Sequence, residues 1–289
     1  MSHGDWDKDL VAMRTRYWAG EVKKAAGFEG KKDKDFIDAC RFGNTKLADL
    51  GGMTWDGYLA GKKNPVYKSV DAVENVLPGT ALNFYKGPKG LELWKVLAGD
   101  VKEAEALLDS TLEAEYGGGA TSGWDLGQKV FWLVLSVLAF PVASFVEQVA
   151  HEGRVRAGEA LPWSDIQHLV DRGVINPPMD GGEVRLSSLL AVCDDTRKIY
   201  TLENSFATFG AHLVSYAFER YSNHGTDLGF SPEFIAAALG LLPLAEAANN
   251  NALKLIAKTI NQGLVLGAIQ YELPEVQSDL VSYVNKKLI

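Results

Sequence analysis

The sequence predicts an all-α, mainly helical protein. Apolar residues recur along the chain at the spacing of amphipathic helices, and runs of alternating β-branched residues are few. Several segments also begin with a polar capping residue and end at glycine or proline, as helices do. Hydrophobic residues make up 47% and charged residues 23% of the 289 residues, the composition of a globular protein with a core.

Two of the helices expected in the first 116 residues are marked by an apolar face. One covers residues 67–77 and stops at Pro78-Gly79. Its apolar face is formed by Val70, Val73, Val76 and Leu77. The other covers residues 101–115, which are rich in good helix formers. Its apolar face is formed by Ala104, Leu107, Leu108 and Leu112.

The uncharged run at residues 130–146 is a candidate for either a core helix or a membrane span. It is shorter than the roughly 20 residues that a spanning helix needs, and it contains Pro141. We favour a buried core helix, because such a helix is apolar all round. After it, Ser164 as N-cap and Gly173 as a stop predict a short helix.

Three helices are expected near the C-terminus. The first begins with Ser231 as N-cap and Pro232 at the first helical position, and Gly240 and Pro243 should weaken or end it. The second follows a polar break at residues 249–251 and should close at Gly263. The third begins at Pro274. Its apolar stripe, formed by Val276, Leu280, Val284 and Leu288, is more typical of packing on the protein's own core than on a partner.

The glycine-rich segment 117–123 predicts a linker between two domains. We expect an N-terminal helical extension at 1–29, a module with its following helices at 30–116, and a helical domain at 124–289. Residues 1–100 carry 16 Lys and Arg against 14 Asp and Glu, whereas residues 101–289 carry 13 against 23. The second domain is therefore acidic, and only the first suits an acidic partner.

Composition also predicts the compartment. The N-terminus lacks the basic start and apolar run of a secretory signal, and two cysteines are too few for a disulfide framework. We therefore expect a cytoplasmic protein without a membrane segment.

No catalytic or metal-binding pattern is convincing, so we expect no cofactor, no metal and no enzyme. The five histidines lack zinc-ligand spacing, and no GxSxG motif occurs. Asp165, His168 and Asp171 share one side of the expected short helix, where a solvated polar face is the favoured interpretation over a metal or proton-relay site. Cys193 lies beside acids that would raise its thiol pKa.

Residues 46–79 carry the most specific pattern in the chain. Leu47-Ala48 is followed by Gly52, an apolar residue and a helix cap follow at Met53-Thr54, and the sequence GKKNP occupies residues 61–65. In these features the segment resembles the Cro/CI-type helix-turn-helix of many bacterial and phage repressors. The interval from Gly52 to Gly61 is about one helical turn shorter than the family's.

The resemblance implies double-stranded DNA as a partner through residues 46–79. Thr54 and its neighbour Trp55 would begin the recognition helix, with Thr54 near base edges and Trp55 packed mostly inward beside Tyr58. Phosphates would be neutralised by Lys62, Lys63 and Lys68. The alternative is a helix, a lysine-bearing turn and a second helix without a nucleic-acid role.

We therefore expect a DNA-binding transcriptional regulator of bacterial or phage origin. Its acidic C-terminal domain would serve homodimerisation or sensing, since two half-sites give usable affinity. The alternative function is a helical protein–protein interaction module, an adaptor or inhibitor, that binds a protein partner through the acidic domain without contacting DNA.

Overall fold

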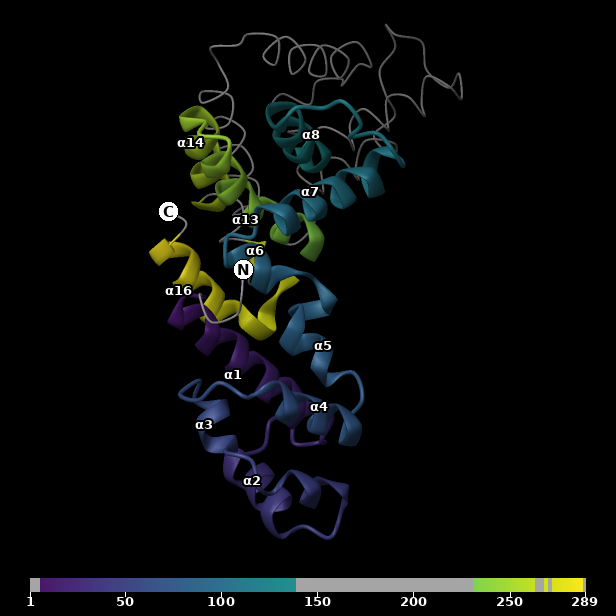
Figure 1. Cartoon of the computed structure of the whole chain (residues 1–289), viewed down its shortest axis with the longest axis vertical. Coiled ribbons are helices and arrows are strands. Elements are labelled where there is room, and N and C mark those ends of the chain that lie inside the picture. The colour runs from purple at the N-terminus through teal and green to yellow at the C-terminus, as the bar shows by residue number, and fades with distance from the viewer. Residues whose placement is uncertain (1–5, 139–230, 263–267, 270–271, 288–289) are drawn as a thin grey trace, which may run out of the picture. The chain divides into compact units, whose positions relative to one another are not determined.

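A computed structural model describes residues 6–138, 231–262, 268–269 and 272–287 of the protein. These residues form helices and turns, with no strand among them, so the all-α prediction is confirmed (Figure 1). The chain divides into two compact units. Unit 1 comprises Met1–Ala104 and Leu273–Lys287, and unit 2 comprises Glu105–Glu272 with Leu288–Ile289.

Unit 1 is organised around one long helix. Its elements are α1 (Lys8–Ala25), α2 (Asp33–Phe42), η2 (Lys46–Leu50), α3 (Trp55–Leu59), α4 (Tyr67–Val76), α5 (Thr80–Tyr85), η3 (Pro88–Gly90), α6 (Leu93–Leu97), η7 (Pro274–Val276) and α16 (Gln277–Lys287). The central helix α1 contacts α3, α5, α6, η7 and α16. It begins where the Asp7 carboxylate accepts a hydrogen bond from the Asp9 N–H.

The core of unit 1 is a cluster of aromatic rings. Trp18, on α1, is fully buried and stacks on Trp55 at 5.7 Å between ring centroids. Phe84 from α5 and Tyr58 from α3 contact Trp18 edge to face. Phe36 from α2 contacts Trp55 in the same way at 5.0 Å. Aromatic pairs of this kind contribute beyond their buried area, so the cluster joins α1, α2, α3 and α5 into one core.

The C-terminal helix α16 belongs to unit 1. Leu280 and Val284 are fully buried, and the Tyr283 hydroxyl donates a hydrogen bond to the Leu97 carbonyl at 3.2 Å. Three ion pairs join it to the N-terminal segment: Arg16 to Asp279 at 2.7 Å, Lys287 to Asp7 at 2.8 Å, and Lys286 to Asp9. The expectation that the terminal stripe packs on the protein's own core is confirmed for its described residues, and Leu288 lies outside them.

Unit 2 contains most of α7 (Val101–Tyr116), together with α8 (Leu126–Leu138), α13 (Pro232–Ala247) and α14 (Asn251–Ile260). Ser231 caps α13 as predicted, accepting from the Phe234 N–H at 3.1 Å. Gly240 and Pro243 were expected to weaken or end this helix; they do not end it, because α13 continues to Ala247. Every residue from 234 to 245 is buried, and that packing offsets the roughly 3 kcal/mol that an internal proline costs.

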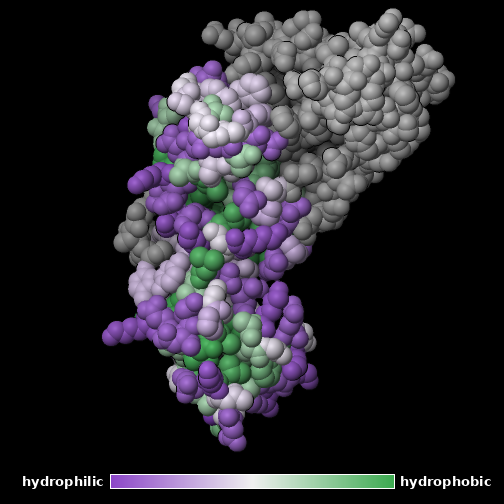
Figure 2. Space-filling model, turned by 90° about the vertical axis from the view of Figure 1, so that its right-hand side faces the viewer, coloured by the Kyte–Doolittle hydropathy of each residue, from purple (hydrophilic) through white to green (hydrophobic). Residues whose placement is uncertain are grey.

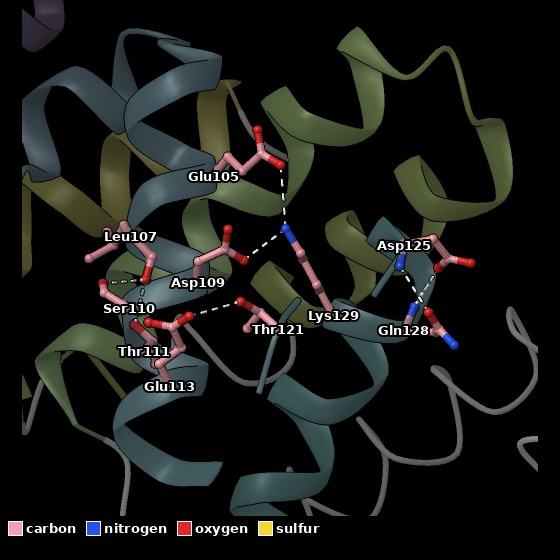
Figure 3. A network of polar contacts seen from close by, with 10 residues as sticks. All are labelled: Glu105, Leu107, Asp109, Ser110, Thr111, Glu113, Thr121, Asp125, Gln128 and Lys129. Atoms are coloured by element: carbon pink, nitrogen blue, oxygen red, sulfur yellow. Dashed lines mark hydrogen bonds and ion pairs between the residues drawn. The ribbon is translucent and has the colours of Figure 1, made fainter. Parts of the chain in front are cut away.

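The glycine-rich segment 117–123 lies within unit 2 and joins α7 to α8. The Thr121 hydroxyl donates to the Glu113 carboxylate at 3.1 Å, and Lys129 on α8 pairs with Asp109 at 2.8 Å and Glu105 at 3.4 Å (Figure 3). The division into units falls after Ala104 and not at the glycines. These polar contacts attach the segment and the first turn of α8 to α7.

Some predictions fall outside the described residues. They concern the short helix at 164–173, the group of Asp165, His168 and Asp171, Cys193, and the end of the apolar run 130–146 beyond residue 138. Among the described helices, none combines the length and the apolar character needed to cross a membrane.

Candidate nucleic-acid interface

The segment expected to read DNA forms two very short helices, η2 and α3, joined by a turn at Gly51 and Gly52. Thr54 is the half-buried N-cap residue of α3, although its side chain makes no capping hydrogen bond. Trp55 is 1% exposed and donates its indole N–H to the Leu50 carbonyl at 3.1 Å. The expected inward packing is confirmed for Trp55 and Tyr58. Trp55 was expected among the DNA-binding residues, but its side chain is buried in the core and does not reach the surface.

Residues 61–68, which we name the lysine loop, leave α3 through a fixed turn. Gly61 has φ of +67°, and a Cβ there would lie 2.5 Å from Arg16 Nη1 and 3.0 Å from the Ala12 carbonyl oxygen on α1. The N–H groups of Lys62 and Lys63 both donate to the Gly57 carbonyl, at 2.9 and 3.2 Å. Only glycine allows this backbone to lie directly on α1.

Asn64 anchors the middle of the lysine loop to α1. Its side-chain oxygen accepts a hydrogen bond from Arg14 Nη2 at 3.2 Å and lies 3.3 Å from the Thr15 hydroxyl. The Arg14 guanidinium is buried, 4.1 Å from the centroid of the Phe84 ring. Burial lowers the pKa of Arg14 to about 10, so it remains protonated at neutral pH. The loop is thus held in place by the core.

Lys62, Lys63 and Lys68 are exposed. Within the described part of the chain none of the three forms an ion pair, and no acidic residue occurs between Asp56 and Asp71. Asp56 itself lies 3.5 Å from Arg41, which balances part of its charge. The lysine loop therefore carries three positive charges and no acidic residue in the same stretch of chain, which makes it a locally positive surface.

An exposed aromatic ring adjoins these lysines. Tyr67 is 51% exposed, and its ring lies nearly parallel to that of Tyr85, at 19° and 6.0 Å between centroids. Val66 and Leu82 are also exposed, at 65% and 47%. Figure 2, which views the molecule from the side of α4 and α5, shows hydrophobic residues within a largely hydrophilic surface. The surface thus offers both positive charge and apolar contact.

The other candidate sites have less chemical content. In the described residues no group of three His, Cys, Asp or Glu could hold a metal ion. Burial raises the pKa of the Cys40 thiol to about 11, which makes it a poor nucleophile. An open pocket of about 310 Å³ lies between α1 and α16, but ion pairs of Arg16 with Asp279 and of Lys286 with Asp9 line it. Its wall charges neutralise one another.

Sequence reasoning found the lysines but missed the groups around them. Tyr67 directly precedes Lys68 and was available as a signal, since aromatic residues beside lysines are typical of nucleic-acid surfaces. Arg14 lies far before the motif in sequence and Tyr85 shortly after it, and the packing of α1 and α5 brings both side chains to the motif. No local pattern could have indicated them.

No family model, no curated protein and no solved structure matches this chain.

Proposed function

We propose that the protein binds DNA through the lysine loop of unit 1 and acts as a transcriptional regulator. The observation that carries the proposal is the set of exposed lysines at positions 62, 63 and 68, free of ion pairs among the described residues and held on a rigid support. Phosphates are the partner that such a set fits, because their neutralisation supplies most of the affinity of non-specific DNA binding.

The support of the lysine loop favours binding without large rearrangement. Gly61 lies against α1, and Asn64 is hydrogen-bonded to Arg14, so the loop backbone is positioned before a ligand arrives. Pre-organised groups lose less conformational entropy on binding. The lysine loop should therefore lose little conformational entropy when it binds.

The proposal assigns a smaller role to α3 than the family resemblance implies. A recognition helix reads bases by laying several side chains in the major groove. With only five residues in α3, and with Trp55 and Tyr58 buried, few side chains remain for that task. We infer that the lysine loop contributes chiefly phosphate contacts, which position a protein on DNA and carry little sequence information.

A charge-reversal experiment tests the proposal. Affinity for random duplex DNA would be measured by fluorescence anisotropy for the wild type and for Lys62→Glu combined with Lys63→Glu. We expect the double variant to bind about tenfold or more weakly, because two favourable phosphate contacts become repulsive. The matched control is Lys34→Glu with Lys102→Glu, which changes the net charge equally at exposed positions in the first turns of α2 and α7.

If both double variants weaken DNA binding equally, the effect comes from the total charge of the protein, and the lysine loop is not the binding surface. Absence of binding by the wild type at low salt, with recovery of a stoichiometric protein partner, would favour the interaction-module alternative instead. The acidic majority in unit 2, 20 Asp and Glu against 10 Lys and Arg, suits a basic protein partner in that case.

A further inference from the structure

The aromatic pair beside the lysine loop adds a chemistry that phosphate binding does not use. Tyr67 occupies the first position of α4, between the exposed side chains of Val66 and Lys68. About half of its side chain is exposed to solvent, although a large aromatic side chain is usually largely buried. Solvent therefore reaches part of this side chain, beside its contact with the Tyr85 ring.

Tyr85 gives that ring a fixed backing. The Tyr85 hydroxyl lies 3.3 Å from the Asp71 carboxylate, to which it donates a hydrogen bond, and its ring contacts Phe84 edge to face at 5.5 Å. Partial burial and then Asp71 raise the pKa of Tyr85, so the phenol stays neutral and keeps this hydrogen bond. Phe84 in turn is 1% exposed. The pair is built on the core of unit 1.

We propose that Tyr67, backed by Tyr85, stacks with an unpaired base of a single-stranded nucleic acid whose phosphates contact Lys62, Lys63 and Lys68. The inference rests on the proposed function and specifies the form of nucleic acid that this surface prefers. It needs both features together: a π-face for the base and a positive loop for the backbone.

An intact duplex offers no open base face to the aromatic part of this surface. Its bases present only their edges in the grooves, and their faces are stacked on one another. A single strand exposes base faces, and stacking on an aromatic side chain is sequence-tolerant because every base has such a face. The same lysines serve both forms, so the tyrosine ring is what distinguishes them.

Asp71, on α4, is an acidic residue that contacts the aromatic pair. Its carboxylate accepts from the Tyr85 hydroxyl and thus faces the ring edge of Tyr85. The three lysines at positions 62, 63 and 68 precede Asp71 in the chain, so this stretch carries three positive charges and one negative charge. A base stacked on Tyr67 therefore places its phosphates next to a surface that is positive on balance.

The experiment compares two probes with the full-length protein. A thymidine oligonucleotide of about 15 nucleotides and a random duplex of about 15 base pairs are titrated at one salt concentration. Variants are Tyr67→Ala, Tyr67→Leu and Tyr67→Phe. The control is Phe42→Ala, which removes a ring that is 79% exposed at the end of α2. Circular dichroism confirms that each variant is folded.

We expect the single strand to bind the wild type more tightly than the duplex. Tyr67→Ala and Tyr67→Leu should weaken single-strand binding by about 5- to 100-fold, the effect of removing one stacked aromatic residue. Tyr67→Phe keeps the ring and should retain most of the affinity, and Phe42→Ala should have no effect. Duplex binding should change little in all four variants.

Two results separate failure of this inference from failure of the proposed function. The inference alone would be overturned if duplex binding depends on the lysines but the single strand binds no more tightly than the duplex. It would also be overturned if Tyr67→Ala and Tyr67→Leu leave single-strand binding unchanged. Absence of binding to both probes would overturn both.

Discussion

Gly61 is the residue on which the position of the lysine loop depends most. Its left-handed conformation and its approach to α1 both exclude a side chain. Because Lys62 and Lys63 follow it directly and donate to the Gly57 carbonyl, a shift at Gly61 would displace the two lysines with it.

Gly61→Ala should therefore lower both stability and DNA affinity. We expect a loss of about 1–2 kcal/mol in the free energy of unfolding, since a residue with a Cβ pays that amount in the left-handed region. Urea unfolding followed by tryptophan fluorescence measures the loss. Gly52→Ala is the control, because no atom lies within 4 Å of its Cβ position. Equal stability of the two variants would show that the close approach at Gly61 is not needed.

The individual residues of the motif were predictable to different degrees. A lysine beside glycine and proline is exposed in most folds, and Lys62 and Lys63 follow that rule. Inward packing of Trp55 was predictable from its size and apolar character. The support that Arg14 gives to Asn64 was not, because it depends on how α1 crosses the loop.

At the scale of elements, a corner between α4 and α5 positions the aromatic pair. Glu74 on α4 accepts hydrogen bonds from the N–H groups of Gly79 and Ala81, both at 2.7 Å, and so caps the start of α5. Partial burial alone would raise the pKa of Glu74, but these hydrogen bonds outweigh it, and the pKa is lowered. The corner therefore depends on an ionised carboxylate.

This predicts a pH dependence for Glu74→Gln. A carboxyl group whose pKa is lower in the folded protein stabilises it above the unfolded value of about 4.3, and this contribution disappears as pH falls through the folded value. At neutral pH the variant should be less stable by roughly 1 kcal/mol, and the difference should shrink below about pH 4.5. Urea unfolding across this range measures it, with Asp49→Asn, an exposed acid on η2, as control. A pH-independent difference would contradict the capping role.

Helix starts were more predictable than helix ends. Ser231 and Pro232 form a local signal for the start of α13, and the structure confirms it. The stop expected at Pro243 fails because a buried helix gains more from continued packing than the proline costs. The local sequence shows the cost of a proline inside a helix but not the free energy gained by burying the residues around it.

At the scale of the whole molecule, residues 105–272 of unit 2 lie in sequence between the two segments that form unit 1. The chain leaves unit 1 after Ala104 and returns to it at Leu273. The glycine-rich segment 117–123 could not indicate this, because the return of α16 to α1 is a contact between distant parts of the sequence. The apolar stripe of α16 predicted that this helix packs on a core but not on which part of the chain.

Removal of residues 273–289 tests the insertion. We expect unit 1 to lose at least about 3 kcal/mol, because the buried side chains of Leu280, Tyr283 and Val284 are each worth about 1.5–3 kcal/mol. A chain ending at Lys287 is the control and should retain its stability. Urea unfolding followed by circular dichroism measures both. If the free energy of unfolding of the N-terminal region stays the same after the truncation, α16 does not belong to unit 1.

The dependence of DNA affinity on salt measures how many phosphates the lysine loop contacts. It compares the wild type with a variant in which Lys62, Lys63 and Lys68 are replaced by glutamine, on one duplex, from about 50 to 200 mM salt. Each phosphate contact contributes about 0.9 to the slope of log affinity against log salt. If the lysine loop holds the backbone, the slope of the variant should be smaller by about 2 to 3. An unchanged slope would show that these three lysines do not contact the DNA backbone.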